Sequence, residues 1–365
     1  MEQTLGHVTH FQNLQAAVSQ QAAIEATWLP IDFGLSGIER FVPAYRGNWS
    51  VRASLRARRQ LSRELARRDF DALFFHSQVT ALFSPGIMRR IPSVVSLDAT
   101  PVNYDAVGAA YGHRPAGGGW LDEQKRRMNR DVFHAAHAIV AWSDWARGSL
   151  IADYGVPRER ISVLAPGASP AYFQIGAERG SVSTEAAPVR LLFVGGDFER
   201  KGGPLLLESV AAARTQRAFE LHVVTQRAVA PRPNVFVHRG IGPNSPELLR
   251  LFRQADAFVL PSRGECLSLV LMEATAAGLP VLSSDVGGLR EAAISEQTAI
   301  IVTPNDAAGL RAGLERLVDD RSLRQRLGSA GHALARAKFD ARRNNQAILD
   351  LIAETATAKA ARRVA

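Results

Sequence analysis

Short apolar runs alternate with longer stretches of helical period along most of this chain. Glycine, proline, serine or charged residues bound each run, as they bound the buried strands of a parallel sheet. This alternation predicts an α/β fold with parallel sheets and right-handed crossovers. The runs predicted as strands are 72–75, 92–97, 138–141 and 161–164 in the first half, and 191–194, 221–224, 235–238, 257–260, 281–283 and 299–302 in the second.

The chain begins with a glycine turn but almost without the strand that normally precedes one. Gly6 and His7 open a helical stretch that continues through Val18. Only residues 1–5 remain for the preceding strand, so we expect it to be very short or shortened by the start of the sequence. Further helices are predicted over 51–68, over 121–136 and from the N-cap residue Ser143 to Tyr154, with glycine-rich loops over 28–50 and 108–120.

The length of 365 residues exceeds the usual size of a single core, so two domains are expected. A polar run rich in Gly, Ala and Ser, residues 176–188, separates the two sets of strands and is typical of a linker. We therefore expect residues 1–170 to form an N-terminal domain, 171–345 a C-terminal domain, and 346–365 a terminal helix with a basic tail.

Composition is that of an ordinary soluble α/β protein, with 46% hydrophobic and 22% charged residues. The single cysteine, Cys266, excludes an internal disulfide framework and fits a reducing compartment. The sequence has no apolar run long enough to span a membrane and no signal peptide. These features predict a cytoplasmic protein, and contact with the inner face of a membrane stays open.

The net charge of +9 predicts an anionic partner, such as a phosphorylated substrate, anionic lipid or nucleic acid. Basic residues concentrate in 51–68, where Val51, Leu55, Leu61 and Leu65 form a narrow apolar stripe. Such a helix could lie on an anionic membrane, or its stripe could pack on the sheet with the arginines in solvent. Nucleic acid is not expected, because the basic stretches lack interleaved aromatic residues and any recognition motif.

Residues 257–291 combine a strand, a turn, a helix and a second strand, and they carry two carboxylates. The first strand ends in a turn that delivers Glu265. Because ligands of open parallel sheets bind beyond the carboxyl ends of the strands, Glu265 lies where a ligand is expected. Glu273 follows about two helical turns further along the chain.

The predicted start of this helix suits an anion. The amides of Cys266, Leu267 and Ser268 would face a phosphate or diphosphate, with the positive end of the helix dipole behind them. Glu265 and Glu273 would accept hydrogen bonds from sugar and ribose hydroxyls, which indicates a nucleotide sugar. The alternatives are that Glu273 is a solvated helix residue, that Glu265 merely favours the helix start, and that Cys266 is a catalytic thiol, although no histidine stands near it in sequence.

A second anion-binding turn follows the strand 191–194. It contains Gly195 and Gly196, then Arg200 and Lys201 before the next helix. Amides and cations are therefore expected to meet the charge of a leaving phosphate without a metal ion. An Asp-x-Asp string precedes its strand instead of following it, and no P-loop, zinc-protease or hydrolase motif occurs. We expect no metal and no cofactor beyond the nucleotide sugar.

Four stretches occur in a characteristic order: IVAWSDWARGSLIADYGVPRERISVLAPGAS, LFVGGDFERKGG, VFVHRGIGPNSPELLRLFRQADAFVLPS and GECLSLVLMEATAAGLPVLSSDVGGLREAA. In them the chain resembles the retaining family-4 nucleotide-sugar glycosyltransferases of the GT-B architecture, specifically over roughly residues 138–340 and weakly before. The resemblance implies two Rossmann-like domains facing across a cleft. The donor would lie mainly on the second and the acceptor on the first, with the last helix crossing back to the first domain.

By this resemblance, Glu265 would hold donor-sugar hydroxyls, Glu273 the ribose diol and Lys201 the diphosphate. The family commonly has Gly-Arg after the strand, where this chain has Gly195-Gly196. The missing arginine leaves the phosphate to Lys201, with Arg200 as the candidate substitute, and a lysine does not reproduce the bidentate contact of an arginine. The stretch that matches the nucleobase lining is Arg239, Gly240 and Ile241.

The N-terminal domain departs further from the family pattern. Gly6 and His7 match the glycine-rich first turn, which approaches the donor phosphate and the acceptor. Many members end a strand with a histidine near the donor sugar, whereas here the strand 92–97 delivers Asp98, and His76 ends the preceding strand. Either side chain is a candidate for the polar group at the reacting carbon. The alternative for His76 is a strand-end residue bonded to a backbone carbonyl.

The resemblance implies transfer of a hexosyl group, with retention, from a nucleoside-diphosphate sugar to the hydroxyl of a glycan, lipid-linked or small-molecule acceptor, in cell-envelope or other glycan assembly. Two alternatives stay open. One is a nucleotide-sugar epimerase of the same architecture, and the other is a non-catalytic scaffold that binds a nucleotide sugar.

Overall fold

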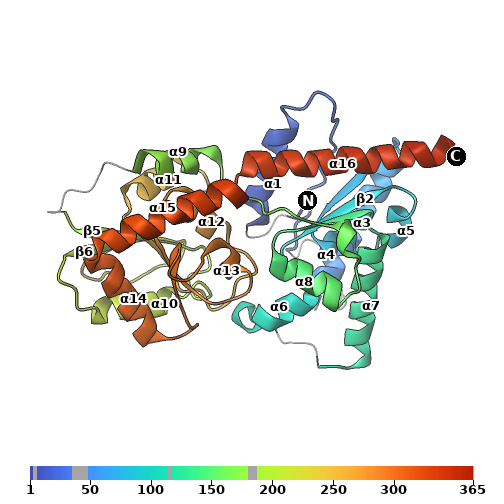
Figure 1. Cartoon of the computed structure of the whole chain (residues 1–365). Helices are drawn as coiled ribbons and strands as arrows, with labels where there is room; N and C mark the ends of the chain where they lie inside the picture. Colours follow the sequence, from blue (N-terminus) through green and yellow to red (C-terminus); the bar gives the residue numbers. More distant parts are fainter. Residues whose placement is uncertain (3–5, 35–47, 114–116, 180–186, 365) are drawn as a thin grey trace. The chain divides into compact units, whose positions relative to one another are not determined.

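The computed structural model describes residues 1–2, 6–34, 48–113, 117–179 and 187–364 (Figure 1). The chain divides into two compact units. The first comprises Met1–Asp105, Pro115–Ala165 and Arg342–Ala365, and the second comprises Ala106–Arg114 and Pro166–Ala341. Each unit builds its own parallel sheet, so the predicted α/β class is confirmed.

The sheet of the first unit has four strands in the order β1-β2-β3-β4, all parallel. Apolar side chains from the strands pack against Phe133 and Leu150 of the surrounding helices. The strands are β1 (Leu73–His76), β2 (Ser93–Leu97), β3 (Ala138–Ala141) and β4 (Ile161–Val163). The helices are α1 (His7–Val18), α3 (Trp49–Leu65), α4 (Gln78–Ala81), α5 (Pro85–Met88), α6 (Pro101–Val107), α7 (Trp120–Ala135), α8 (Asp144–Ala152) and α16 (Ala341–Val364), with a short 3-10 turn η3 (Arg158–Arg160).

The sheet of the second unit has six strands in the order β10-β9-β8-β5-β6-β7, again parallel. The chain builds outward from β5 through β7, then returns to the other side of β5 with β8, so the direction of winding switches between β5 and β8. The strands are β5 (Val189–Val194), β6 (Phe219–Val224), β7 (Val235–His238), β8 (Ala257–Leu260), β9 (Val281–Ser284) and β10 (Ala299–Val302). Every strand predicted from an apolar run is present within a residue or two of its expected bounds.

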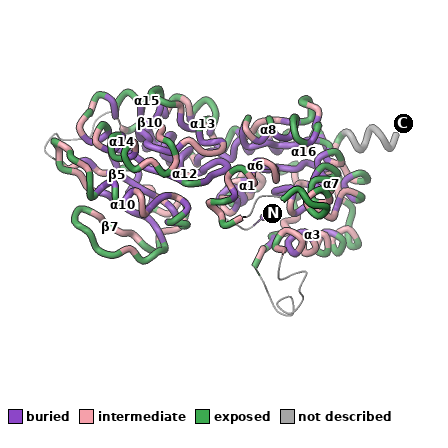
Figure 2. Tube along the Cα trace, turned by 90° about the horizontal axis from the view of Figure 1, so that it is seen from below, coloured by how far each residue is buried: buried purple, intermediate pink, exposed green. Residues whose placement is uncertain are grey.

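Helices cover both faces of this second sheet (Figure 1). On one side α9, α11, α12 and α15 pack together, and on the other α10 packs against α14. Figure 2 shows the buried residues concentrated along the strands and the inner helix faces of each unit. The helical elements are η2 (Gly108–Tyr111), α9 (Pro170–Glu178), α10 (Gly203–Ala212), α11 (Pro246–Gln254), α12 (Leu269–Ala276), α13 (Leu289–Ala292), α14 (Ala307–Asp319) and α15 (Arg321–Lys338).

The units do not divide where the composition suggested. The second begins at Pro166, ahead of the expected residue 171, and α9 occupies the start of the run predicted to be a linker. Gly176, in that run, lies within α9 and packs closely against the carbonyl of Ala276. A run rich in small residues can mark a helix that approaches a neighbour closely, which composition alone does not distinguish from a linker.

The segment 106–114 also differs from expectation, since it falls within the predicted first domain, 1–170, but belongs to the second unit. It contains the 3-10 turn η2 where a glycine-rich loop was predicted. The reason is packing, because Val107 and Ala110 lie directly against Gly264 of the second unit.

The two ends of the chain meet the first unit in different ways. Glu2 forms an isolated parallel bridge with Ile31, while residues 3–5 of the expected short strand lie outside the described part. The last helix, expected from residue 346, begins at Ala341. Asn344 donates to the carbonyl of Ala165 at 2.9 Å, which ties α16 to the first unit.

The basic helix α3 turns its apolar side inward, burying Ala53, Ala57 and Leu61. Several of its arginines are used within the fold, because Arg52 donates to the carbonyl of Phe33 and the following arginines donate to further backbone carbonyls. Of the predicted stripe, Leu61 is buried and Leu65 packs against the core of the first unit, whereas Val51 and Leu55 are half-buried, so the packing of the stripe inside the unit is confirmed in part. Among the described residues, no helix combines the length and apolar character that crossing a bilayer requires.

Substituting Gly176 by alanine should destabilise the second unit. A methyl group there would lie 2.3 Å from both the Ala276 carbonyl oxygen and Nδ1 of His332, which are themselves hydrogen-bonded at 2.7 Å. We expect a loss of about 1–3 kcal/mol in the free energy of unfolding, measured by urea denaturation.

The matched control is Gly148 of α8, where an added methyl group would meet nothing within 4 Å. Gly148→Ala should therefore be neutral or stabilising by up to about 1 kcal/mol. Equal effects at the two positions would contradict this packing.

Candidate active site

A buried ion pair lies at the switch point of the second sheet. Lys201 comes from the turn after β5, and Glu265 comes from the turn after β8. Because β5 and β8 are neighbours, these turns meet at one edge of the sheet, and Lys201 Nζ lies 2.9 Å from Glu265 Oε1. Ligands of doubly wound sheets bind at such a point. The sequence predicted both residues, and the structure brings them together.

Arg200 is the second cation at this carboxylate. Its Nη1 lies 3.0 Å from Glu265 Oε1 and donates to the carbonyl of Gly264 at 2.7 Å, while its Nε donates to Asp197 at 3.0 Å. The guanidinium also stacks on the ring of Tyr111, 4.4 Å from the centroid. With a side chain only 4% exposed, Arg200 is committed to holding these groups. These contacts favour a role in orienting Glu265 over a role as the substitute for the missing phosphate arginine.

Two opposing effects set the charge of Glu265. Burial alone would raise the pKa of its carboxyl group, but the charges of Lys201 and Arg200 outweigh burial and lower it. The Ser262 hydroxyl donates a further hydrogen bond to the same oxygen at 3.2 Å. Glu265 is therefore an oriented, ionised carboxylate. Its burial and its two ion pairs are not explained by the alternative that an acidic residue merely favours a helix start.

Glu273 of α12 presents a different carboxyl group. It is only 7% exposed, which excludes the solvated helix residue that spacing alone left open. Burial raises its pKa to about 7, against the lowering effects of the Lys201 charge and of an interaction with the Tyr172 hydroxyl. Burial and the nearby carboxylate in turn raise the pKa of Tyr172. No local sequence pattern indicates Tyr172, because it lies on α9, far from Glu273 in the chain.

Helix α12 begins later than predicted. Its first residue is Leu269, so Cys266, Leu267 and Ser268 form the turn before the helix, and the first helical amides start at Leu269. All three turn residues are buried, and the backbone carbonyl of Cys266 accepts a hydrogen bond from the Gly288 amide. The Ser268 hydroxyl is buried, and no hydrogen-bond partner for it occurs among the described residues.

Of the two glycines after β5, only Gly195 lies close to the lysine. A side chain at Gly195 would lie 2.7 Å from Cδ of Lys201, whereas one at Gly196 would meet nothing within 4 Å. The stretch Arg239, Gly240 and Ile241 follows β7, where Gly240 has a φ of +75° and its amide reaches the Gln226 side chain at 3.4 Å. Glycine permits this left-handed turn without strain.

The predicted residues of the first unit gather at the carboxyl edge of its own sheet. His7 follows the N-cap Gly6 of α1, and its Nε2 lies 3.7 Å from Asp98 and 3.8 Å from Glu2. His10, three residues along the same helix face, meets His76 with 2.8 Å between Nδ1 and Nε2. His10 is not among the residues predicted from the sequence, although its spacing of three from His7 is a usable signal.

Only one of these three histidines is suited to carry a charge. Burial alone would lower the pKa of His7, but the Glu2 charge and the bond to Asp98 raise it to about 9. Burial, with the charge on His7, lowers the pKa of His10 to about 3 and that of His76 well below its ordinary value. Of the three, His7 is therefore the imidazole whose surroundings favour the charged form.

The two candidates for a polar group at the reacting carbon differ in access. His76 is fully buried and pairs with His10, whereas the Asp98 side chain is 27% exposed. Trp142 packs against His7 and His10 and donates from Nε1 to Ser96 at 2.9 Å. The geometry favours Asp98 over His76 as the group that a ligand can reach.

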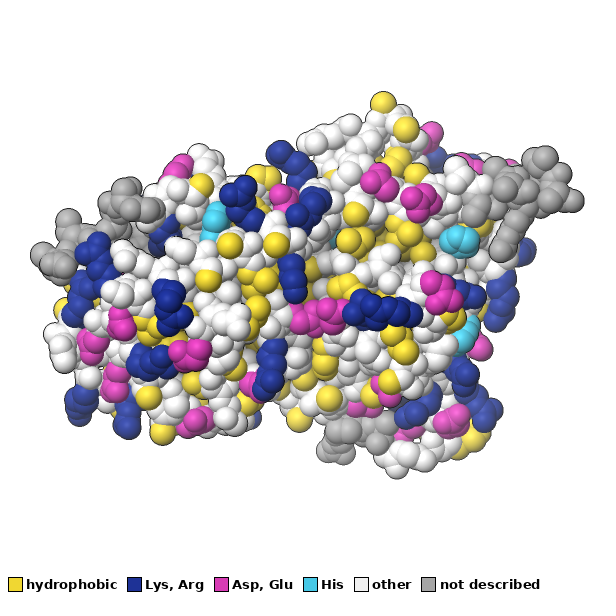
Figure 3. Space-filling model, viewed as in Figure 1, with side chains coloured by type: hydrophobic (Ala, Val, Ile, Leu, Met, Phe, Trp, Pro, Cys, Tyr) yellow, Lys and Arg dark blue, Asp and Glu magenta, His cyan; other side chains and the backbone are white. Residues whose placement is uncertain are grey.

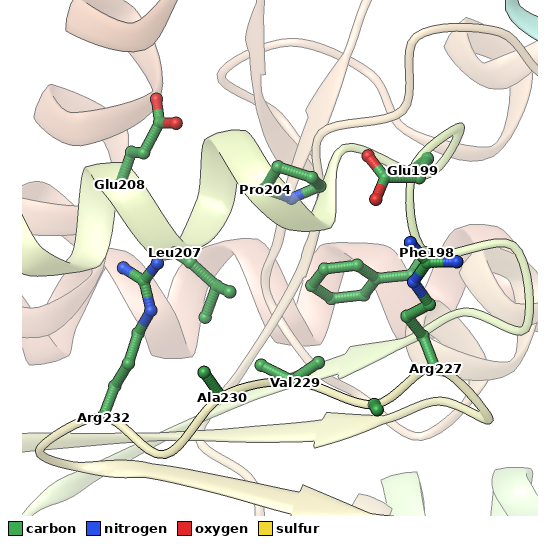
Figure 4. A pocket seen from close by; sticks show the side chains of 10 residues that line it. Phe198, Glu199, Pro204, Leu207, Glu208, Arg227, Val229, Ala230 and Arg232 are labelled. Atoms are coloured by element: carbon green, nitrogen blue, oxygen red, sulfur yellow. The ribbon is translucent and has the colours of Figure 1, made fainter.

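A separate cavity of about 230 Å³ lies beside α10 and does not include Lys201, Glu265 or Glu273. Figure 4 shows Phe198 and Leu207 directed into the space between α10 and the segment that carries Val229 and Ala230. No group of three or more His, Cys, Asp or Glu side chains able to hold a metal occurs in the described part of the chain.

Family profiles match both halves of the sequence. Residues 188–320 match the family described as Glycosyl transferases group 1, and residues 20–172 match Glycosyltransferase Family 4. The chain belongs to the family-4 glycosyltransferases.

Relatives and solved structures agree with this family. The chain is 28% identical over 240 residues to D-inositol 3-phosphate glycosyltransferase of Corynebacterium diphtheriae, covering 60% of this chain and 56% of the relative. It is also 28% identical over 236 residues to glycogen synthase of Mycobacterium tuberculosis, covering 61% and 55%. The matches to this family-4 chain therefore span little more than half the length of these curated relatives.

The structural neighbours cover nearly the whole chain. Sucrose-phosphate synthase from Thermosynechococcus elongatus aligns with a TM-score of 0.69 at 17% identity, covering 98% of this chain and 95% of the neighbour. WaaG, a glycosyltransferase involved in lipopolysaccharide biosynthesis, aligns with a TM-score of 0.64 at 16% identity, covering 96% of this chain and 97% of the neighbour. Anabaena HepE in complex with UDP-glucose aligns with a TM-score of 0.63 at 15% identity, covering 96% of this chain and 97% of the neighbour. At these identities the neighbours establish the fold of this family-4 chain, which is GT-B.

The raised pKa of Glu273 predicts a pH-dependent stability. Because the folded state keeps a proton on Glu273 that the unfolded state releases above about pH 4.5, this residue should cost stability as the pH rises from about 4.5 to 7. Relative to Glu273→Gln, the wild type should lose on the order of 1–3 kcal/mol over that range. Urea unfolding at several pH values measures the difference. The matched control is Glu208→Gln, which replaces an exposed carboxylate of α10 and should show no such trend.

Proposed function

We propose that this chain transfers a hexosyl group, with retention of configuration, from a nucleoside-diphosphate sugar to an acceptor hydroxyl. The observation that carries the proposal is the buried Glu265 carboxylate, oriented by Lys201 and Arg200 at the switch point of a doubly wound sheet. A cation, a fixed carboxylate and a second carboxyl group on the next helix suit a diphosphate flanked by hydroxyl-bearing groups.

Each group has a distinct proposed part in donor binding. The Lys201 ammonium binds the diphosphate, together with the first amides of α12. Glu265, being ionised, accepts hydrogen bonds from hydroxyls of the donor sugar. Glu273, whose pKa is about 7, binds the ribose diol and is able to accept or donate a proton in that contact. Gly240 and its neighbours border the nucleobase.

The proposed reaction exchanges one bond at the anomeric carbon for another. The bond from this carbon to the diphosphate oxygen breaks, and the electron pair leaves with the diphosphate. The acceptor oxygen bonds to the same carbon from the same face, and its proton passes to the leaving phosphate oxygen. Lys201 and the α12 amides stabilise the negative charge that develops on the diphosphate.

The acceptor is proposed to bind at the first unit, near Asp98 and His7. Two acceptor classes are proposed, a small polyol phosphate, as in the name of one relative, and a glycan or lipid-linked acceptor. We propose a cytoplasmic location, which suits the buried thiol of Cys266.

Incubation with nucleotide sugars tests the proposed function. UDP-glucose is the first donor to try, because a neighbour of the same fold binds it, followed by the GDP and ADP sugars. Acceptor-dependent release of the nucleoside diphosphate is the expected result. Formation of an epimeric donor would instead establish an epimerase, and donor binding without either product would establish a scaffold.

Lysine variants of the same protein make this assay specific. Lys201→Ala should weaken donor affinity about tenfold or more, because it removes the ammonium group that lies beside Glu265 and is proposed to bind the diphosphate. Lys125→Ala removes an exposed lysine of α7 and should leave affinity unchanged. Equal affinity of the Lys201 variant and the wild type would rule out the diphosphate contact.

We also propose contact with an anionic membrane, through charge alone. Leu61 of the apolar stripe is buried, while Arg59 and Arg63 of α3 are exposed. Arg67, just beyond the end of α3, is also exposed, and its Nη1 lies 2.8 Å from Glu64. On the face shown in Figure 3, Lys and Arg side chains are interspersed with Asp and Glu, so any basic surface there is mixed in character. Such contact would be weak and sensitive to salt.

Co-sedimentation with phosphatidylserine-containing vesicles checks this contact. Binding should fall as salt rises, and changing Arg59, Arg63 and Arg67 to Glu should abolish it. The same three changes at the exposed Arg253, Arg311 and Arg336 of the second unit alter net charge equally and should have a smaller effect. No sedimentation of the wild type at low salt would remove the membrane from the proposal.

A further inference from the structure

A short segment from the first half of the sequence completes the surroundings of the donor-site carboxylate. Residues 106–114 belong to the second unit, where Val107 and Ala110 pack on Gly264. A side chain at position 264 would lie 2.6 Å from Cβ of Ala110 and 2.8 Å from the carbonyl oxygen of Val107. The contact is therefore as close as a glycine allows, and Gly264 immediately precedes Glu265.

Tyr111 of this segment contacts Arg200 in two ways. The guanidinium carbon lies 4.4 Å from the centroid of the tyrosine ring, and Nη1 donates to the tyrosine hydroxyl at 3.3 Å. The ring face attracts the cation electrostatically but offers no carboxylate that would compete with Glu265. Tyr111 therefore restrains the guanidinium without neutralising it.

Arg200 passes this restraint to the carboxylate. The same Nη1 contacts Oε1 of Glu265 and the carbonyl of Gly264, so a displaced guanidinium would release both the carboxylate and the turn that presents it. Asp197 holds Nε on the other side. Without the Tyr111 ring, the guanidinium loses the contact on one of its sides and has room to turn away from Glu265.

We propose that Tyr111 is a positioning residue for the donor sugar, acting through Arg200 on Glu265. The inference rests on the proposed function, in which Glu265 binds sugar hydroxyls. The donor half of the site is then not encoded by the C-terminal half of the sequence alone. Tyr111 should matter more for the sugar moiety than for the nucleoside diphosphate. Arg200, which Tyr111 restrains, holds the carboxylate that binds the sugar, whereas the diphosphate is bound by Lys201, a separate side chain that reaches Glu265 at 2.9 Å.

Affinities for UDP-glucose and UDP, measured by calorimetry on the full chain, test this assignment. Tyr111→Leu keeps apolar packing but removes the ring face. It should weaken the affinity for UDP-glucose about tenfold and change the affinity for UDP by less than about twofold. Tyr111→Phe keeps the ring and loses only the long hydroxyl contact, so it should retain affinity within about threefold. Phe236→Ala removes a half-exposed ring elsewhere in the second unit and should change neither affinity.

A second measurement reads the arginine directly. In spectra of protein labelled with 15N-arginine, the Arg200 Nε proton should be shifted by the ring current in wild type and in Tyr111→Phe, and this shift should vanish in Tyr111→Leu. The signal is assigned with Arg200→Lys. Combining Arg200→Lys with Tyr111→Leu should cost no more affinity than Arg200→Lys alone.

The outcomes separate the inference from the proposed function. If the wild type binds none of the UDP, GDP and ADP sugars, the proposed function fails and the inference falls with it. If the wild type binds a donor sugar and Tyr111→Leu binds it equally well, or loses the sugar nucleotide and the free nucleotide in equal measure, the positioning role alone is overturned.

Discussion

The second unit is organised around a buried carboxylate held by two cations. Taking charges out of water is costly, and the arrangement persists only because Lys201, Arg200 and Ser262 all reach Glu265. The sheet topology makes this possible, since the winding switches between β5 and β8 and places their turns side by side. Gly195 and Gly264 allow the close approach of Lys201 and of residues 106–114, and Tyr111 of that segment contacts Arg200.

The two carboxyl groups near Lys201 illustrate how environment separates similar residues. Glu265 contacts Lys201 and Arg200 directly, so the cations outweigh burial and keep its pKa low. Glu273 is about as deeply buried, but the charge of Lys201 lowers its pKa by less than burial raises it, so the pKa rises to about 7. One group is thus a permanent acceptor, while the other is able to exchange a proton near neutral pH, which suits different hydroxyls of one nucleotide sugar.

The first unit solves a related problem with histidines. Three imidazoles gather at the carboxyl edge of its sheet, and mutual repulsion with burial leaves the charge on His7, beside Asp98 and Glu2. His10 and His76 are neutral neighbours that fix the cluster through one hydrogen bond and contacts with Trp142. Asp98 is therefore the part of the cluster that a ligand can reach, whereas sequence position made Asp98 and His76 equal candidates.

The sequence by itself determined the strands, because apolar runs of this length and composition have few other ways to be buried, and it identified Lys201, Glu265 and Glu273 from their offsets to those strands. Only the tertiary structure decided their partners. Tyr111 lies 89 positions from Arg200, and Tyr172 meets Glu273 from a separate helix, so no local pattern links them. The same holds for the placement of residues 106–114 and of Gly176, where close packing, invisible in composition, determines which residues belong together.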